Sequence, residues 1–374
     1  MKFITFGCWN KDMCNPENPN NGMSLVFNNL KNLKKDFYDF LILSGDNYYP
    51  LKNKQLQKKT FNEENFNSGF KCLTDLDKKT YILQGNHEYL DIIDDQNCQS
   101  IIKQKKIISE NQKLIFFDEV KFKFDEDTKT LIVMIDTTIL SEFDQEDIDR
   151  NLHTCYQNSL NETKVQEIIN KILSQVTHIL ASYKYQKLIF VGHHPILSIK
   201  IKKNDPKYIF SETIPNNTNI NSLLDFFLNI KDNIKNINKI YYLCADVHFY
   251  QKSIINIDDL EIEQYIVGTG GADLDNIYNG NIDISKFKIK EGIKNFDFKI
   301  IEQFKNFGYL IVNLTLDGPN FEFKKIGQII FVLKIIKQLE FEKKYRKYPI
   351  KDKDYFNLYR KYKYKYLKLK SFII

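Results

Sequence analysis

Short apolar runs rich in β-branched and aromatic residues recur along most of the chain and alternate with segments of helical periodicity. Runs of about four to eight such residues, bounded by turn residues, are typical of buried strands. They predict strands at 2–7, 39–44, 80–84, 114–117, 130–136, 187–191, 239–244, 263–267, 308–315 and 319–324. Strands that alternate with helices and end in a late run of strands predict a layered α/β fold.

Helical spacing of apolar residues is clearest at 163–182 and weaker at 24–35 and 221–235. Apolar residues three and four positions apart form one stripe along a helix, and such a stripe packs against a sheet or another helix. Residues 92–128 are mixed in charge and show no regular pattern. They are therefore expected to form an irregular insertion or a peripheral hairpin.

Charge divides the chain into an acidic body and a basic tail. Residues 324–374 hold 16 Lys or Arg against 4 Asp or Glu, a net charge of +12, whereas the whole chain carries +6. The predicted organisation is a domain over residues 1–323 followed by a Lys- and Tyr-rich tail over 324–374. Interleaved lysines and aromatics could bind a polyanion such as nucleic acid. The favoured alternative for the tail is a helix that is docked on the domain or bound to a protein partner and keeps its basic face in solvent.

The six cysteines are scattered, with no CxxC pair and no regular spacing: Cys8, Cys14, Cys72, Cys98, Cys155 and Cys244. The first predicted strand begins at Lys2, which leaves no room for a signal peptide. No apolar run approaches the roughly 20 residues of a membrane-spanning helix. These features predict a cytoplasmic chain in a reducing compartment, where buried cysteines remain thiols.

Five short segments that directly follow predicted strands concentrate residues suited to a metal centre. They contain four of the six histidines and read Gly7-Cys8-Trp9, Gly45-Asp46-Asn47-Tyr48-Tyr49, Gly85-Asn86-His87-Glu88, Gly192-His193-His194-Pro195 and Ala245-Asp246-Val247-His248. Ligands of open α/β sheets bind beyond the carboxyl ends of the strands. The order and placement of the five segments, rather than any one of them, therefore indicate a shared site.

A phosphoesterase with two cations needs a carboxylate that bridges the ions, further nitrogen and oxygen ligands, and an open position for water and substrate. Asp46 offers the bridging carboxylate and Tyr49 a phenolate. His87 can protonate a leaving oxygen without binding metal. Neutral ligands are offered by Asn86, His193 and His248.

The set resembles the calcineurin-like metallophosphoesterase superfamily, and specifically the purple (tartrate-resistant) acid phosphatases. Residues 45–49 fit the GDxxY motif of those enzymes, residues 134–138 (MIDTT) resemble one of their strand ends, and residues 267–271 (VGTGG) resemble their late glycine turn. The resemblance covers residues 1–315 and implies a four-layer α/β/β/α sandwich with mixed sheets. The tail separately resembles C-terminal segments of giant DNA virus proteins, which implies a viral origin, with the host cytoplasm or the virion as location.

The resemblance implies a metal-dependent phosphatase that hydrolyses phosphomonoesters by a metal-activated hydroxide. His87 stands at the catalytic, substrate-facing position of the family, and His194 at a substrate-binding position. The implied ligands form two sets that share Asp46: Cys8, Tyr49 and His248 for one ion, and Asn86, His193 and Asp246 for the other.

Two of these positions depart from the family pattern. Residue 8 is Cys where the family has Asp, and residue 246 is Asp where the family motif GHxH has His. Thiolate and carboxylate can both bind cations, so the expected cofactors are two ions of zinc, manganese or iron. A buried apolar thiol at Cys8 and a loop cap at Asp246 are the alternatives. In that case the chain would be a catalytically degenerate binding or scaffold protein of the same fold.

Overall fold

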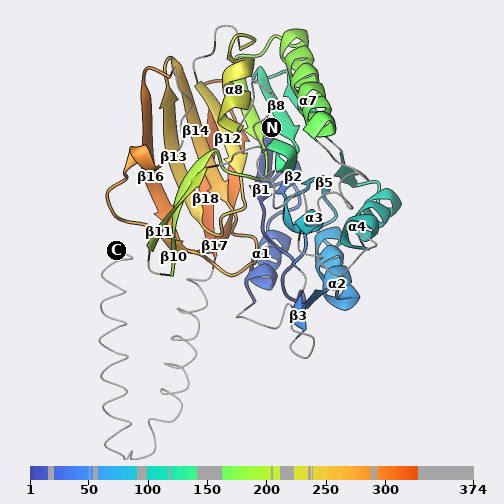
Figure 1. Cartoon of the computed structure of the whole chain (residues 1–374). Coiled ribbons are helices and arrows are strands. Elements are labelled where there is room, and N and C mark those ends of the chain that lie inside the picture. Colours follow the sequence, from blue (N-terminus) through green and yellow to red (C-terminus); the bar gives the residue numbers. More distant parts are fainter. Residues whose placement is uncertain are drawn as a thin grey trace, which may run out of the picture. The chain divides into compact units, whose positions relative to one another are not determined.

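The computed structural model describes residues 1–15, 21–49, 51–53, 58–90, 99–117, 119–140, 162–203, 205–210, 223–234, 237, 239–287 and 293–326. All of them belong to one compact unit, Met1–Ile326 (Figure 1). Residues 327–374 lie outside the described residues, so the boundary at 323 and the role of the basic tail stay predictions. Among the described helices, none is long and apolar enough to cross a membrane.

Two mixed sheets form the centre of this unit. The first has the strand order β18-β17-β1-β2-β5-β6, in which β1, β2, β5 and β6 are parallel. Its strands are β1 (Lys2–Phe6), β2 (Phe40–Ser44), β5 (Lys79–Leu83), β6 (Leu114–Phe116), β17 (Phe307–Leu314) and β18 (Pro319–Ile326). Strand β17 runs antiparallel to β1 and to β18, so the sheet is mixed.

The second sheet has the order β16-β13-β14-β12-β9-β8-β7, and its parallel part is β14, β12, β9 and β8. At one edge β13 pairs antiparallel with β14 and β16 with β13, and at the other edge β7 pairs antiparallel with β8. The strands are β7 (Val120–Asp125), β8 (Thr130–Ile135), β9 (Lys187–Val191), β12 (Lys239–Cys244), β13 (Tyr250–Ile257), β14 (Leu260–Val267) and β16 (Phe296–Phe304).

Stacked aromatic rings join the two sheets face to face. The ring of Tyr250 in β13 stacks on Phe323 of β18 with centroids 4.1 Å apart, and Tyr265 of β14 stacks on Phe321 of β18 at 4.3 Å. Offset stacks of this kind add to the free energy gained by burying the rings. These ring pairs therefore help to hold the two sheets together.

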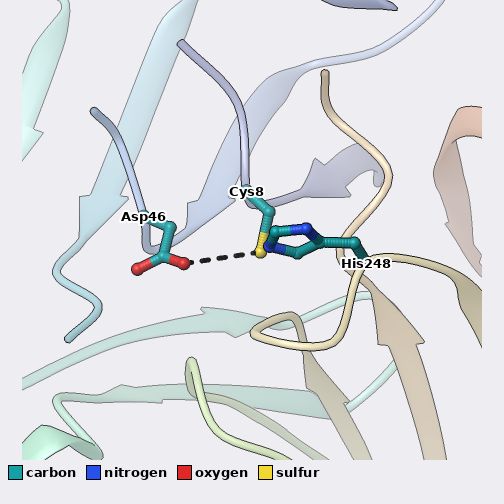
Figure 2. Close-up of side chains that lie close together, drawn as sticks. All are labelled: Cys8, Asp46 and His248. Atoms are coloured by element: carbon teal, nitrogen blue, oxygen red, sulfur yellow. Dashed lines mark hydrogen bonds between the residues drawn. The ribbon is translucent and has the colours of Figure 1, made fainter. Parts of the chain in front are cut away.

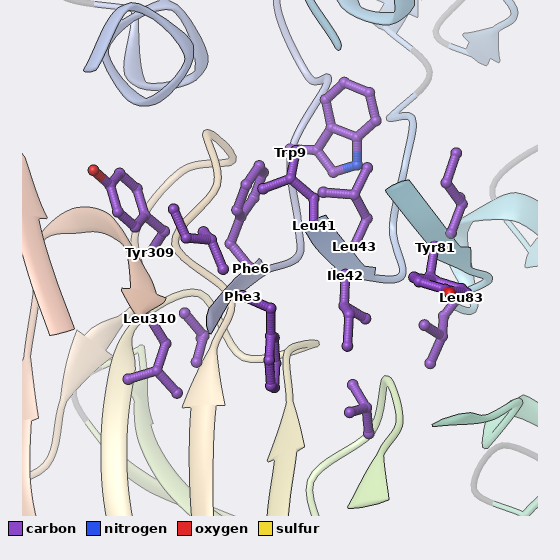
Figure 3. Close-up of a cluster of buried hydrophobic side chains, with 14 of the residues drawn as sticks. Phe3, Phe6, Trp9, Leu41, Ile42, Leu43, Tyr81, Leu83, Tyr309 and Leu310 are labelled. Carbon is purple, nitrogen blue, oxygen red and sulfur yellow. The ribbon is translucent and has the colours of Figure 1, made fainter. Parts of the chain in front are cut away.

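Helices cover the outer face of each sheet. Figure 3 shows part of the core of the first sheet, with Trp9 among Phe6, Leu41 and Leu43. Trp9 also packs on Phe27 of α1 (Gly22–Lys31) and on Phe70 of α2 (Glu63–Thr74), with both centroid distances 5.4 Å. On the second sheet, Phe227 of α8 (Leu223–Lys231) packs on Phe190 of β9 at 5.2 Å, beside α7 (Glu162–Ser182). The chain is therefore the four-layer α/β/β/α sandwich with mixed sheets that the sequence predicts.

Smaller elements surround this sandwich: β3 (Leu51–Asn53), β4 (Lys58–Thr60), α3 (His87–Leu90), α4 (Gln99–Glu110), η1 (Thr138–Leu140), β10 (Leu197–Lys202), β11 (Asp205–Phe210), β15 (Asn276–Ile277) and η3 (Ile284–Lys286). The expectation of an irregular insertion at 92–128 is wrong for its described part, which contains α4, β6 and β7. The hairpin expected there is present, because β7 pairs antiparallel with β8 at the sheet edge.

Cys14 and Cys72 form a disulfide, which the prediction of reduced thiols missed. The fold brings the loop after β1 against α2, where the backbone N–H of Cys14 also donates to Ser68 Oγ at 3.0 Å. Cys8 and Cys244 are buried free thiols. Oxidising compartments favour disulfides, and the cytoplasmic location stays a prediction.

Replacement of both Cys14 and Cys72 by serine is expected to lower the free energy of unfolding by about 2–4 kcal/mol. The physical reason is that the bond joins residues 58 apart and so restricts the unfolded chain. Denaturant unfolding with and without a thiol reductant measures the effect. The reductant should destabilise the wild type and leave the double variant unchanged. Equal stability of the two proteins under oxidising conditions would contradict the prediction.

Candidate metal centre

The five segments lie directly beyond the carboxyl ends of five strands. Cys8 follows β1, Asp46 follows β2 and Asn86 follows β5, which are neighbouring parallel strands of the first sheet. His193 follows β9 and Asp246 follows β12, which are parallel neighbours in the second sheet. Carboxyl ends of parallel strands meet at one edge of a sheet, so the site forms where the edges of two sheets meet.

Backbone hydrogen bonds hold the loops of the two sheets together at this edge. The N–H of Gly7 donates to the carbonyl of Val267 at 3.0 Å, and the N–H of Ala272 donates to the carbonyl of Cys8 at 2.9 Å. Within the first sheet, the N–H of Cys8 donates to the carbonyl of Gly45 at 3.1 Å. The backbone that carries Cys8 is therefore fixed from both sides.

Three of the candidate ligands have left-handed backbone conformations. Their φ angles are 55° for Cys8, 53° for Asp46 and 53° for Asp246. Such a conformation costs an L-residue about 1–2 kcal/mol and persists only where the surroundings impose it. The same conformation occurs at turn residues outside the candidate site, such as Lys129 and Asp258, so it fixes the backbone of the three candidates without assigning them a function.

Two glycines allow the side chains of the site to approach one another. A Cβ atom on Gly85 would lie 2.4 Å from Asp46 Oδ1 and 2.7 Å from His193 Nε2. Gly45 has a φ of 88°, and a Cβ there would lie 2.5 Å from His193 Nδ1. A side chain at either position would therefore displace His193 or Asp46.

Cys8, Asp46 and His248 bring their donor atoms within 4.8 Å of one another (Figure 2). The Cys8 thiol donates to Asp46 Oδ2 over 3.7 Å. The Tyr49 hydroxyl donates to the same oxygen at 2.6 Å and lies 3.0 Å from His248 Nε2. One side of Asp46 thus faces sulfur, phenol oxygen and imidazole nitrogen together.

The other carboxylate oxygen of Asp46 faces His193. His193 Nε2 lies 3.2 Å from Asp46 Oδ1 as an ion pair, and this buried nitrogen has no further hydrogen-bond partner among the described residues. The opposite ring nitrogen, Nδ1, donates to the carbonyl of Ser44 at 2.6 Å. This bond leaves Nε2 as the nitrogen that can bind a cation, as in many metal sites.

His248 is held in the same way. Its Nδ1 donates to the carbonyl of Asp273 at 2.7 Å, so its Nε2 points toward Tyr49. Its backbone N–H donates to Asp275 Oδ2 at 3.0 Å, and Lys200 forms an ion pair of 2.8 Å with that carboxylate. The donor set therefore fits a cation: a shared carboxylate, two oriented imidazoles, a thiol and a phenol.

The remaining candidates lie around this cluster. His87 Nε2 is 4.0 Å from Asp46 Oδ2, its ring packs on Tyr49 with centroids 4.4 Å apart, and its side chain is 25% exposed. His194 packs on His193 and shares a hydrogen bond of 3.0 Å with the Thr137 hydroxyl through Nδ1. Asn86 and Asp246, both partly buried, stand at their strand ends outside the three-residue cluster. The roles of all these residues stay predictions.

Burial and mutual charge shift the pKa values within the site. Burial acts to raise the pKa of Asp46, but the charges of His193 and His87 outweigh it and hold that pKa well below its usual range. Burial opposes the charged form of His193, but Asp46 raises its pKa to about 10. Burial and the charge of Asp46 raise the pKa values of Cys8 and Tyr49 well above their usual ranges. Cys8, Tyr49 and His193 therefore each hold a proton at neutral pH.

Sequence reasoning missed several residues that orient the site. The Thr137 hydroxyl accepts hydrogen bonds from the backbone N–H groups of His193 and His194 at 3.0 and 3.1 Å. Asp273 and Asp275 hold His248, as described above. The resemblance of residues 134–138 to a strand end of the purple acid phosphatases is the one sequence signal that indicates Thr137.

No family model matches the sequence, and no curated protein matches it. Among solved structures, the chain is similar to GAP50, described as the anchor in the inner membrane complex of Plasmodium, with 15% identity over 88% of this chain and 85% of that chain and a TM-score of 0.49. It is similar to a purple acid phosphatase of yellow lupin with 12% identity over 87% of this chain and 51% of that chain, TM-score 0.48. It is also similar to PhoD with 11% identity over 87% and 68%, TM-score 0.48.

Proposed function

We propose that the chain is a metal-dependent phosphoesterase that hydrolyses phosphomonoesters at the centre around Asp46. One observation carries this proposal: the two oxygens of a single buried carboxylate face different candidate ligands. Oδ2 faces Cys8 and Tyr49, and Oδ1 faces His193. A carboxylate that bridges two cations has this arrangement.

The ligands proposed for the two cations are those of the sequence analysis. Cys8, Tyr49, His248 and Asp46 would hold one ion, and Asp46, His193, Asn86 and Asp246 the other. Because Cys8 supplies sulfur, we propose zinc for its half of the centre, ahead of manganese or ferrous iron. When bound, two such cations lower the pKa of water and neutralise charge on a phosphoryl group.

The side chains of this chain would perform the remaining steps. His87 is exposed enough to meet a substrate and near enough to Asp46 to be oriented by it, so we assign it the donation of a proton to the leaving oxygen. Its backbone N–H donates to Asp46 Oδ1 at 3.2 Å, which keeps the residue at the edge of the centre. The substrate-binding role of His194 stays a prediction, because its side chain is only 2% exposed and its Nδ1 is bonded to the Thr137 hydroxyl.

A catalytically degenerate binding or scaffold protein is the second candidate. The altered residues Cys8 and Asp246 favour it, because each half of the centre differs from the family at one ligand. On this alternative a cation would bind weakly or serve the fold alone. The basic tail would then be an element for binding a polyanion or a protein partner.

Metal content and turnover, measured together on the purified full chain, distinguish the candidates. The chain is supplied with zinc, manganese or iron and tested with a generic aryl phosphate. At least one bound ion per chain together with turnover supports the phosphoesterase. Bound metal without turnover favours the scaffold, especially if the double variant Cys8→Asp, Asp246→His gains activity. Less than one ion per chain and no turnover would contradict the proposed function.

Cation affinity is expected to rise with pH between about pH 6 and 8. The pKa values of Cys8, Tyr49 and His193 are raised, so each holds a proton across this window that a cation must displace. Lower pH strengthens the competing protons, and higher pH weakens them. Each displaced proton makes the affinity rise by about tenfold per pH unit. Competition with a zinc chelator at constant ionic strength measures the slope, and a flat profile would contradict the prediction.

A further inference from the structure

The carboxylate of Glu88 connects two loops of the centre without facing the cation site. It is fully buried at the beginning of α3. Its Oε1 accepts the backbone N–H of Asn47 at 2.5 Å, and its Oε2 accepts the backbone N–H of Gly85 at 2.6 Å. Both bonds are short, as expected where N–H groups donate to an ionised carboxylate. Burial and the charge of Asp46 raise the pKa of Glu88 to about 8, and the two N–H groups act against this rise.

The two N–H groups belong to the neighbours of proposed ligands. Asn47 directly follows Asp46, and Gly85 directly precedes Asn86. Glu88 therefore fixes the distance between the loop after β2 and the loop after β5. Any change in that distance moves Asp46 relative to Asn86.

Asn47 extends this connection to the loop that carries Cys8. The Asn47 side chain donates to the carbonyl of Leu83 at 2.7 Å and accepts the indole N–H of Trp9 at 2.9 Å. The backbone N–H of Trp9 in turn donates to the carbonyl of Asp46 at 3.1 Å. The loops after three adjacent strands are thus joined by one continuous set of hydrogen bonds.

Burying a carboxylate costs free energy unless its oxygens are hydrogen-bonded, so Glu88 can connect the two loops only because both of its oxygens accept N–H groups. An amide of the same shape would serve worse. Glutamine has one accepting oxygen, and its NH₂ group would face an N–H donor. The site therefore requires a group that accepts on both sides.

We propose that Glu88 is a positioning residue that sets the cation affinity of the centre by fixing the loops of Asp46 and Asn86. The proposal rests on the proposed function, because it assigns Glu88 a part in the same metal site. Residues that orient metal ligands through hydrogen bonds typically change metal affinity by about 10–100-fold when replaced.

The test compares the full chain with Glu88→Gln, Glu88→Asp and the control Glu64→Gln, which changes an exposed glutamate of α2. Zinc affinity is measured by chelator competition well below each midpoint of thermal unfolding. Glu88→Gln is expected to bind zinc about 10–100-fold more weakly than the wild type and Glu64→Gln. A residue that served the fold alone would lower the midpoint and leave the affinity of the folded chain unchanged, and that result would overturn the proposal.

Amide hydrogen exchange separates failure of this proposal from failure of the proposed function. If the wild type binds no zinc, the proposed function fails, and Glu88 is judged by exchange in segments 45–49 and 84–88. Faster exchange there in Glu88→Gln, but not in Glu64→Gln, supports the positioning role, whereas unchanged exchange overturns it. If Glu88→Gln does not fold, zinc affinity and amide hydrogen exchange are measured on Glu88→Asp instead. A zinc affinity and exchange rates equal to those of the wild type would then overturn the proposal.

Discussion

Asp46→Asn is expected to weaken cation binding by about 10²–10⁴-fold and to remove hydrolysis with it. Asp46 is fully buried, and its oxygens meet the Cys8 thiol, the Tyr49 hydroxyl and His193. Removal of one member of a buried charged group costs roughly 3–5 kcal/mol, which corresponds to this loss of affinity. An amide also cannot bridge two cations through two anionic oxygens.

Equilibrium dialysis against zinc and aryl phosphate hydrolysis measure the effect of Asp46→Asn. The matched control is Asp36→Asn, which changes an exposed aspartate in the loop before β2. The control should match the wild type in both measurements. If Asp46→Asn bound zinc as tightly as the control, Asp46 would not be the shared ligand of the centre.

Cys8→Asp is expected to shift the metal preference from zinc toward manganese by at least about tenfold. Thiolate favours zinc and other soft ions, whereas carboxylate suits harder ions such as manganese. Cys8 is fully buried, and its sulfur lies beside Asp46 and His248 (Figure 2). In the cobalt-substituted chain, the absorption band from thiolate to cobalt should disappear with the sulfur.

Cys244→Ala is the matched control, because Cys244 is also a buried free thiol, hydrogen-bonded over 3.7 Å to the carbonyl of Tyr265. It should retain the zinc preference and the cobalt band. Loss of the band in Cys244→Ala, or its survival in Cys8→Asp, would show that Cys8 is not the sulfur ligand.

The apolar pattern was enough to predict the strands of the two sheet centres. All ten predicted strands are present. Most of them are buried on both faces and therefore read as continuous apolar runs, whereas the edge strand β18 alternates between partly buried and exposed residues. Strand β13 was missed since it carries Gln251 and Ser253, which are buried yet polar. They are satisfied by Ser198 at 3.2 Å and Gln264 at 3.1 Å, partners in other strands that no local pattern indicates.

The candidate site was predictable as a set of strand ends but not as a geometry. Polar residues directly after apolar strands identified where Cys8, Asp46 and His248 stand. The sequence could not show that Asp273 and Asp275 return to His248, because those contacts span 25 and 27 residues. Glu88 lies within the third of the five segments, but the sequence does not show which backbone N–H groups its carboxylate accepts. One of them belongs to Asn47, which lies 41 residues away.

X-ray absorption at the zinc edge of the zinc-loaded full chain tests the metal centre most directly. With Cys8, Asp46, Tyr49 and His248 around one ion, the spectrum should contain sulfur at about 2.3 Å and nitrogen or oxygen neighbours at about 2.0–2.2 Å. Because the spectrum averages over all zinc ions, the sulfur should amount to about one per zinc with one ion bound there and about one half with both halves of the centre loaded. The sulfur should be absent in Cys8→Asp and present in Cys244→Ala. A zinc shell without sulfur in the wild type, or no bound zinc, would contradict a metal centre at these strand ends.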